Sequence, residues 1–229
     1  MLAARPPIPF EAQADRRGCG AAALAMAYRA LGREADQARV WTEIARTTEV
    51  GLVAARSFEL AAHALALGLD AATVRARDPW TSLRACGEGP GVALLNHRTT
   101  PSGRGGHFSV LVSADDDGVV IHDPRVGPGR RLGRREFLAL WSPDGRPGEI
   151  AGHVLVAIAA PSGPAPDCPS CRAPMPATIA CPSCRFAIPA RPAYALGCAR
   201  WGCPGRLWDR LHCPRCDAGA IGDAPWWSS

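Results

Sequence analysis

The chain has 229 residues and a formal net charge of +5, and all 26 of its basic residues are arginine. This length allows one medium-sized domain and a second, smaller one. No apolar stretch is long enough for a signal-peptide core or a membrane span, so we expect a cytoplasmic protein that has no membrane partner. Eight of the ten cysteines fall between Cys168 and Cys216, which favours metal ligands over disulfides in such a compartment.

The first predicted element is a helix over residues 19–32, because the segment is rich in Ala, Leu and Met, and Gly32 suits a helix end. Cys19 then lies at the helix N-terminus, where unpaired N–H groups and the helix dipole favour a thiolate. Gln13, six residues upstream, is a candidate amide donor to an oxyanion hole. The alternative is that Cys19 is a small buried residue. The choice between them depends on whether a base and an orienting acid follow.

Further helices and strands are predicted from apolar periodicity and from Gly and Pro positions. We place helices at residues 36–47, 58–67, 78–83 and 134–141, and strands at residues 70–76, 92–95 and 152–159. His63 in the third helix lacks a neighbouring motif and is expected to be structural. Cys86 is expected in a loop with no helix after it, and we also regard it as structural.

A hairpin is predicted around the turn at residues 115–118, with strands at residues 107–112 and 119–124. His107 begins the first strand and Asp123 ends the second. A two-residue loop would place His107 about three residues out of register with Asp123, so a bulge or an asymmetric loop has to absorb the offset. His97 and His122 are rival bases, although His122 points to the opposite strand face from Asp123.

Gln13, Cys19, His107 and Asp123 follow one another in the order of oxyanion donor, nucleophile, base and orienting acid. With the Gly106-His107-Phe108 strand and Asp123-Pro124, this order resembles the C39-like, papain-fold cysteine peptidases that process bacteriocin leaders. The resemblance covers about residues 6–160. It implies an α+β fold of N-terminal helices and an antiparallel sheet, and hydrolysis of a peptide bond, in many members after Gly-Gly. The chain shows no membrane or ATPase portion, which puts a Gly-Gly leader substrate in doubt.

Residues 161–167 are small or proline and read as a linker between a peptidase domain at residues 1–160 and a cysteine-rich domain at residues 168–229. Two Cys-x-x-Cys knuckles can close one four-cysteine Zn²⁺ site. The spacing resembles a tandem, or double, zinc ribbon with two structural sites, formed by consecutive pairs. The predicted ligands are Cys168, Cys171, Cys181, Cys184, Cys198, Cys203, Cys213 and Cys216. The third pair has four intervening residues instead of two, and His212 is a competing ligand.

Two four-thiolate zinc centres would lower the formal charge of the whole chain to about +1, which gives little basis for binding phosphate. Four of the seven tryptophans, Trp201, Trp208, Trp226 and Trp227, lie in the cysteine-rich segment. They favour a docking surface for a protein partner, with the alternative that they form the core of that segment. Two further functions stay open. One is a non-catalytic adaptor that binds peptide, and the other is a thiol amidase or transferase that acts on a non-peptide substrate.

Overall fold

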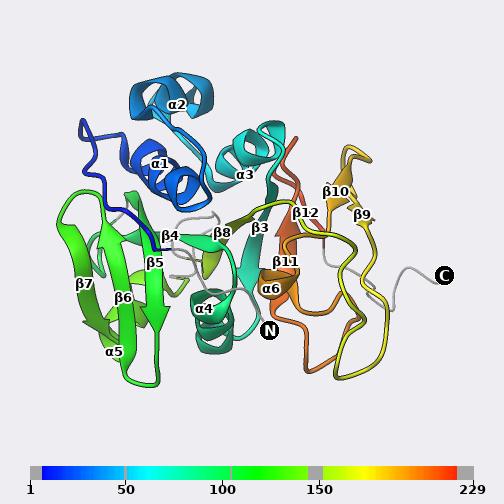
Figure 1. The fold of residues 1–229 in the computed structure, drawn as a ribbon. Helices are drawn as coiled ribbons and strands as arrows, with labels where there is room; N and C mark the ends of the chain where they lie inside the picture. The colour runs from blue at the N-terminus through cyan, green and yellow to red at the C-terminus, as the bar shows by residue number, and fades with distance from the viewer. Residues whose placement is uncertain (1–6, 49–50, 104, 144–151, 221–229) are drawn as a thin grey trace.

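The computed structural model describes residues 7–48, 51–103, 105–143 and 152–220. An eight-stranded antiparallel sheet in the order β12-β11-β3-β8-β4-β5-β6-β7 runs through the molecule (Figure 1). Its strands are β3 (Asp70–Ala76), β4 (Val92–Arg98), β5 (Gly106–Ala114), β6 (Gly118–Asp123), β7 (Gly127–Gly133), β8 (Val154–Ala159), β11 (Trp208–His212) and β12 (Gly219–Ala220). Two small hairpins pair β1 (Arg46–Thr47) with β2 (Val53–Ala54), and β9 (Thr178–Ala180) with β10 (Ala187–Pro189).

Helices cover both faces of the sheet (Figure 1). One face carries α1 (Cys19–Ala30) and α3 (Ser57–Ala66), with α2 (Gln37–Ile44) packed on them. The other face carries α4 (Pro79–Glu88) and α5 (Arg134–Trp141), with α6 (Ala193–Leu196) against α4. Side chains alternate between the two faces along a strand, so Leu94 packs with the first group of helices and Leu95 with the second. This sandwich explains why the central strands β4 and β8 are buried along their whole length.

The α+β class expected from the sequence is confirmed, with an antiparallel sheet behind N-terminal helices. Two predicted helix ends are clearly wrong. The second helix ends at Ile44, because Arg46 and Thr47 pair with β2 instead of continuing the helix. The fourth helix continues to Glu88 and contains Cys86, which was expected in a loop. Asp78 caps the start of this helix, and Leu83 and Cys86, three residues apart, both pack into the core.

The C-terminal segment is joined to the peptidase-like part through the sheet itself. β11 pairs with β3, so that Trp208 faces Ala76 and Leu211 faces Val74. Trp208 and Leu211 are fully buried. The hydroxyl of Tyr194 also donates to the carbonyl oxygen of Val92, at 3.2 Å. The predicted boundaries at residues 160 and 168 stay a prediction, but the two segments share one sheet and one core.

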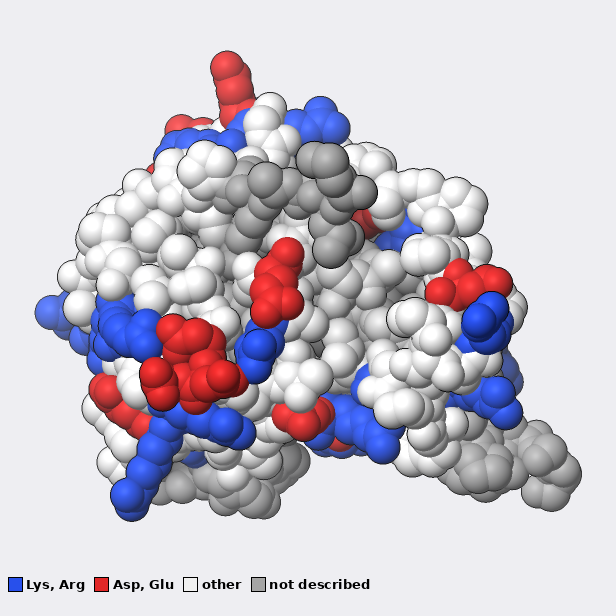
Figure 2. Space-filling view, turned by 60° about the horizontal axis from the view of Figure 1, so that its bottom comes forward, with Lys and Arg blue, Asp and Glu red and all other residues white. Residues whose placement is uncertain are grey.

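The face of the molecule on which α4 and α5 lie carries arginine and acidic side chains side by side (Figure 2). Arg84 pairs with Asp116 at 2.6 Å, and Arg131 pairs with Asp115 at 3.1 Å. A surface that binds a nucleic-acid backbone has instead a continuous basic stripe, which this face lacks. Within the described ranges, no helix combines the length and the apolar character that crossing a bilayer requires.

Candidate active site and cysteine clusters

Cys19 is the first residue of α1, as the sequence predicted, and its sulfur lies against β5. Burial alone would raise the pKa of the thiol, but a hydrogen bond to His107 and the charge of that ring lower it below its ordinary value. The backbone N–H groups of Phe108 and Gly20 contribute in the same direction, because they donate to the sulfur. α1 has no acidic residue in its first turn to oppose this effect. The environment therefore favours a thiolate.

His107 lies in β5 and connects the cysteine to an acid. Its Nε2 donates to Oδ1 of Asp123 at 2.7 Å, which leaves Nδ1 for the Cys19 sulfur. Burial alone would lower the pKa of His107, but the bonds to Asp123 and Cys19 raise it to about 9. Burial alone would raise the pKa of Asp123, but its contact with His107 lowers it to about 2. The pair thus favours a charged imidazolium beside the thiolate.

Asp123 is itself held in place by the turn that follows it. Its Oδ1 accepts the backbone N–H of Arg125 at 3.0 Å, and its Oδ2 accepts from the guanidinium of Arg130 at 3.2 Å. These contacts fix a carboxylate that is 2% exposed. Sequence reasoning missed Arg130, because nothing in a Gly- and Arg-rich stretch indicates that β7 will bring it back to Asp123.

The two rival histidines have other partners. His97 pairs across the strands with His107, but its Nδ1 donates to the carbonyl of Arg98 and its Nε2 accepts from Ser109. Burial lowers the pKa of His97 to about 4, so this ring is neutral. His122 donates to the carbonyl of Ile8 and accepts the backbone N–H of Gly129. The hydrogen bond and the charge that lower the Cys19 pKa come from His107 instead.

The side chain of Gln13 is turned into its own loop. Its backbone N–H donates to the carbonyl of Pro124 at 3.0 Å, which ties the N-terminal segment to the end of β6. Its side-chain Nε2 donates to the carbonyl of Asp15. To stabilise an oxyanion, this amide would have to leave the carbonyl of Asp15 and donate to the substrate oxygen instead. The role of Gln13 in the oxyanion hole therefore stays a prediction. The backbone N–H of Cys19, the first residue of α1, is a second candidate donor to the oxyanion.

A cleft of about 510 Å³ opens beside Cys19. One wall is the start of α1, and another is the β1–β2 hairpin, with Leu52 and Val53 from that hairpin. The floor is formed by Phe108 and by Gly20, where an added Cβ would lie 3.4 Å from the Phe108 ring. Sequence reasoning missed the lining residues Arg16, Arg17, Arg56 and Asn96. For Arg16 and Arg17 a signal was available, since they directly precede the Gly18-Cys19 pair.

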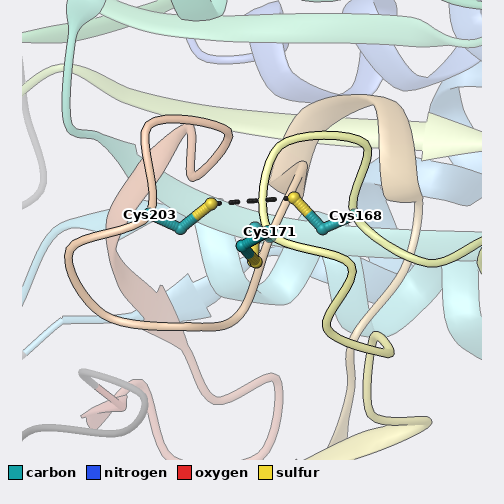
Figure 3. Close-up of side chains that lie close together, drawn as sticks. Cys168, Cys171 and Cys203 are labelled. Carbon is teal, nitrogen blue, oxygen red and sulfur yellow. Dashed lines mark hydrogen bonds between the residues drawn. The ribbon is translucent and has the colours of Figure 1, made fainter.

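The eight C-terminal cysteines form two groups of four, but not the groups expected from consecutive pairs. The first group joins the first and third pairs, and the second group joins the second and fourth pairs. Figure 3 shows three members of the first group, with Cys168 and Cys203 facing one another. The expected consecutive arrangement is therefore wrong. The groups are Cys168, Cys171, Cys198 and Cys203, and Cys181, Cys184, Cys213 and Cys216.

The sulfur positions fit a tetrahedral zinc ion. Sulfurs bound at about 2.3 Å to one tetrahedral ion lie roughly 3.8 Å apart. The closest pairs here are 3.6 Å, for Cys168 with Cys203, and 3.7 Å, for Cys171 with Cys198. The second group repeats both distances. All eight predicted ligands are thus placed in clusters that could hold two metal ions, and filled four-sulfur sites leave no position for catalysis.

Three of the four cysteine pairs have the same backbone geometry. The residue after each Cys-x-x-Cys has a positive φ, at Arg172, Arg185 and Asp217. Its N–H bonds back to the carbonyl of the first cysteine of its pair. His212, a competing ligand by sequence, bonds Asp217 at 3.0 Å and belongs to neither group.

The tryptophans of this segment differ from one another. Trp208 is core, as the alternative interpretation expected, and Trp201 is 48% exposed. Trp226 and Trp227 lie outside the described residues.

The family model described as "Peptidase C39 family" matches residues 7–144, more than half of the chain. A solved protein from Bacillus anthracis, described as a C39-like peptidase, is 16% identical, with a TM-score of 0.56 over 68% of this chain and 96% of that one. The peptidase domain of Streptococcus ComA, described as a bi-functional ABC transporter involved in quorum sensing, is 18% identical, with a TM-score of 0.52 over 68% of this chain and 100% of that one.

A double glycine motif protease from an AMS/PCAT transporter, solved in complex with the leader peptide, is 18% identical, with a TM-score of 0.51 over 69% of this chain and 96% of that one. No protein with a curated description matches the sequence significantly. At these identities the solved structures show a common fold. Together with the family model they establish that the chain belongs to the Peptidase C39 family.

Proposed function

We propose that the protein is an intracellular thiol peptidase that cleaves a peptide bond by a Cys–His–Asp mechanism. The observation that carries the proposal is the continuous chain of hydrogen bonds from Cys19 through His107 to Asp123, built from α1, β5 and β6. A nucleophile needs a base within reach, and the base needs an orienting group. The three residues supply these roles at the edge of a cleft that is open to substrate.

In this mechanism the Cys19 thiolate attacks the carbonyl carbon of the scissile bond. The N–H of Cys19, and the Gln13 amide once it has released Asp15, stabilise the oxyanion. The imidazolium of His107 gives its proton to the leaving amine as the C–N bond breaks, which leaves an acyl-enzyme. His107 then takes a proton from a water molecule, whose oxygen attacks the acyl carbon and releases the thiolate. Asp123 keeps the imidazole oriented in every step.

The cysteine clusters are proposed to hold two structural zinc ions that make the C-terminal segment fold. The sulfur positions support this role, and so do the few large apolar side chains of the segment. Thiolates would supply the ligands, and the ions would fix the loops that carry the four cysteine pairs, from residue 168 to residue 216. We further propose that this segment docks a protein partner or the substrate. The exposed Trp201 supports that role.

The first test measures the reactivity of Cys19 in the zinc-loaded protein. Limiting iodoacetamide is applied from mildly acidic to mildly basic pH, followed by peptide mapping with mass spectrometry. We expect Cys19 to label below the ordinary thiol range of about pH 8.5, and His107→Ala to remove this advantage. Cys86 serves as the internal control, because it is fully buried in α4 and is expected to stay unlabelled.

Peptides are then incubated with the wild type and with Cys19→Ala, beginning with sequences that contain Gly-Gly, the motif named for one of the structural neighbours. Cleavage by the wild type alone supports the peptidase. Labelling of Cys19 no faster than an ordinary thiol overturns it and favours an adaptor that binds peptide in the same cleft. A reactive Cys19 that hydrolyses small amides, but no peptide in the set, points instead to an amidase.

A further inference from the structure

Within the described ranges, the charged side chains that line the cleft beside Cys19 have one sign. Among the described residues they are Arg16, Arg17 and Arg56, and no carboxylate joins them in the lining. Arg16 and Arg17 are both exposed at the mouth of the cleft. A concave site lined by one sign of charge concentrates ligands of the other sign.

Two of these arginines, Arg16 and Arg17, have no acidic partner among the described residues. Within the described part of the chain, neither Arg16 nor Arg17 lies in ion-pair range of a carboxylate. The nearest acid in sequence, Asp15, uses its Oδ1 to accept the backbone N–H groups of Arg17 and Gly18. Arg56 has a partial counter-ion in Asp217, at 4.0 Å. Arg16 and Arg17 are therefore the cations left for a ligand.

Their place in the fold reinforces the positive potential. Both precede α1 directly, at the end of the helix where the dipole is positive and where folded proteins favour acidic side chains. α1 has no acidic residue in its first turn, and its N-cap, Gly18, offers no side chain. Two arginines at this position add positive charge to the positive end of the helix dipole. A bound anion would offset that charge.

Another part of the cleft lining is apolar. Leu52 is 59% exposed and Val53 is 36% exposed, and both line the cleft from the β1–β2 hairpin. They are two of the few large hydrophobic side chains exposed in the described structure. An apolar group of the ligand would cover them and remove this surface from water.

We infer that the cleft takes an acidic peptide, an extended segment in which aspartate or glutamate side chains meet Arg16 and Arg17 and a large apolar side chain covers Leu52 and Val53. This inference rests on the proposed peptidase function and names its substrate class. The carboxylates come from side chains within the peptide and not from its C-terminus, because a peptidase cleft has to admit chain on both sides of the scissile bond.

The test uses fluorescence anisotropy to measure peptide binding to the Cys19→Ala protein, which lacks the nucleophile and cannot cleave the peptide. The probes are short labelled peptides, acetylated and amidated at their ends, that contain Leu and Gly-Gly and differ only in two Glu or two Gln residues. We expect the Glu peptide to bind about three- to tenfold more tightly at low ionic strength, the range for two exposed ion pairs. The advantage is expected to shrink at about 0.15 M salt, where charges are screened within about 8 Å.

The double variant Arg16→Gln/Arg17→Gln should abolish the preference. Arg33→Gln/Arg135→Gln, which removes the same charge from exposed sites outside the cleft, should keep it. Leu52→Ser should weaken both peptides of a pair to the same extent. Equal binding of the two peptides, or a preference that survives in the Arg16/Arg17 variant, overturns the inference. So does a neutral peptide that gains the full advantage from a free C-terminal carboxylate.

Failure of the inference and failure of the peptidase proposal give different results. A reactive Cys19 in the wild type, together with equal binding of the two peptides, overturns the acidic substrate and leaves the peptidase. A clear preference for the Glu peptide, together with a Cys19 that labels as an ordinary thiol, supports the acidic ligand and overturns the peptidase.

Discussion

Asp123 lies on the same face of the sheet as His107 because of one extra residue in β5. Below the bulge Val110 pairs with His122, whereas above it Ala114 pairs with Val119, so Val112 is the additional residue. Asp123 therefore lies diagonally from His107, two residues out of register, which side chains of this length can span. Without the bulge the pairing would shift by one, so Pro124 would face Ser109 in place of Asp123, and the Asp123 side chain would point to the other face of the sheet.

We expect Asp123→Asn to reduce kcat/KM strongly, by up to about 10⁴-fold, the loss known for the equivalent change in a Ser–His–Asp triad. The reason is that Nε2 of His107 would lose the carboxylate that fixes its tautomer and supports its charge. Steady-state cleavage of a peptide found in the first test measures the effect. The matched control is His122→Gln, at the neighbouring position on the other strand face. A loss in the control as large as that in Asp123→Asn would contradict the assignment.

The pH profile of kcat/KM should be bell-shaped. Its two limbs should lie away from the ordinary pKa values of a cysteine and a histidine. The lowered pKa of Cys19 places the acid limb below the ordinary thiol range. The raised pKa of His107, about 9, places the alkaline limb near that pH, since above it the imidazole can no longer donate a proton. In Asp123→Asn the carboxylate that raises the pKa of His107 is gone, so the alkaline limb should move to lower pH. An unchanged alkaline limb in this variant would show that the limb belongs to another group.

The oxyanion role of Gln13 can be separated from its structural role. Gln13→Ala removes the amide but keeps the backbone bond to Pro124, so the fold should persist. If the amide reaches the oxyanion, kcat should fall by about 10²- to 10³-fold with little change in KM. Circular dichroism and the alkylation rate of Cys19 serve as controls, because both should stay as in the wild type. A kcat within about threefold of the wild type would leave the N–H of Cys19 as the main donor.

Local patterns predicted what depends on local sequence. The start of α1 at Cys19 and the whole of α5 follow from helix-forming residues and apolar periodicity, and the histidine and the acid follow from the hairpin. β7 was missed, because Gly127–Gly133 is rich in glycine and arginine and becomes a strand only by pairing with the open edge of β6. The addition of β11 to β3 was also missed. It joins residues more than a hundred positions apart, and no local pattern encodes such a contact.

The pairing of the cysteines could not be predicted for a related reason. Each Cys-x-x-Cys presents two sulfurs in the same way whichever partner it meets, so consecutive and interleaved arrangements have the same sequence pattern. The choice depends on how the chain returns to β3, because the third and fourth pairs flank β11.

Double substitutions can test the interleaved arrangement. Cys171→Ser/Cys198→Ser removes two ligands from one group and should cost one zinc ion. Cys171→Ser/Cys184→Ser removes one ligand from each group and should weaken both sites. Native mass spectrometry counts the retained ions, and cobalt substitution reports the coordination. If consecutive pairs formed the sites, Cys171→Ser/Cys198→Ser would weaken both sites and Cys171→Ser/Cys184→Ser would cost one zinc ion. One experiment therefore distinguishes the two arrangements.

The buried contact between β11 and β3 should make the C-terminal segment part of the stability of the peptidase domain. Trp208 of β11 is fully buried and pairs with Ala76 of β3, so Trp208→Ala is expected to lower the free energy of unfolding by about 3–5 kcal/mol, the usual cost of truncating a large buried side chain. Trp201→Ala is the matched control. That indole is half exposed and contacts mainly the Arg206 guanidinium, so the change should stay within about 1 kcal/mol.

Urea unfolding of the zinc-loaded protein, followed by far-UV circular dichroism, measures both changes. A single transition that shifts to lower urea in Trp208→Ala would show that the sheet unfolds as one unit. If the segments were independent, Trp208→Ala would shift only a minor C-terminal transition. The alkylation rate of Cys19 would then follow the major transition, which Trp208→Ala would leave unchanged. The reason is that α1 packs on β4 and β5, away from β3 and β11. Coincident loss of the enhanced Cys19 reactivity and of the sheet signal is therefore the expected result.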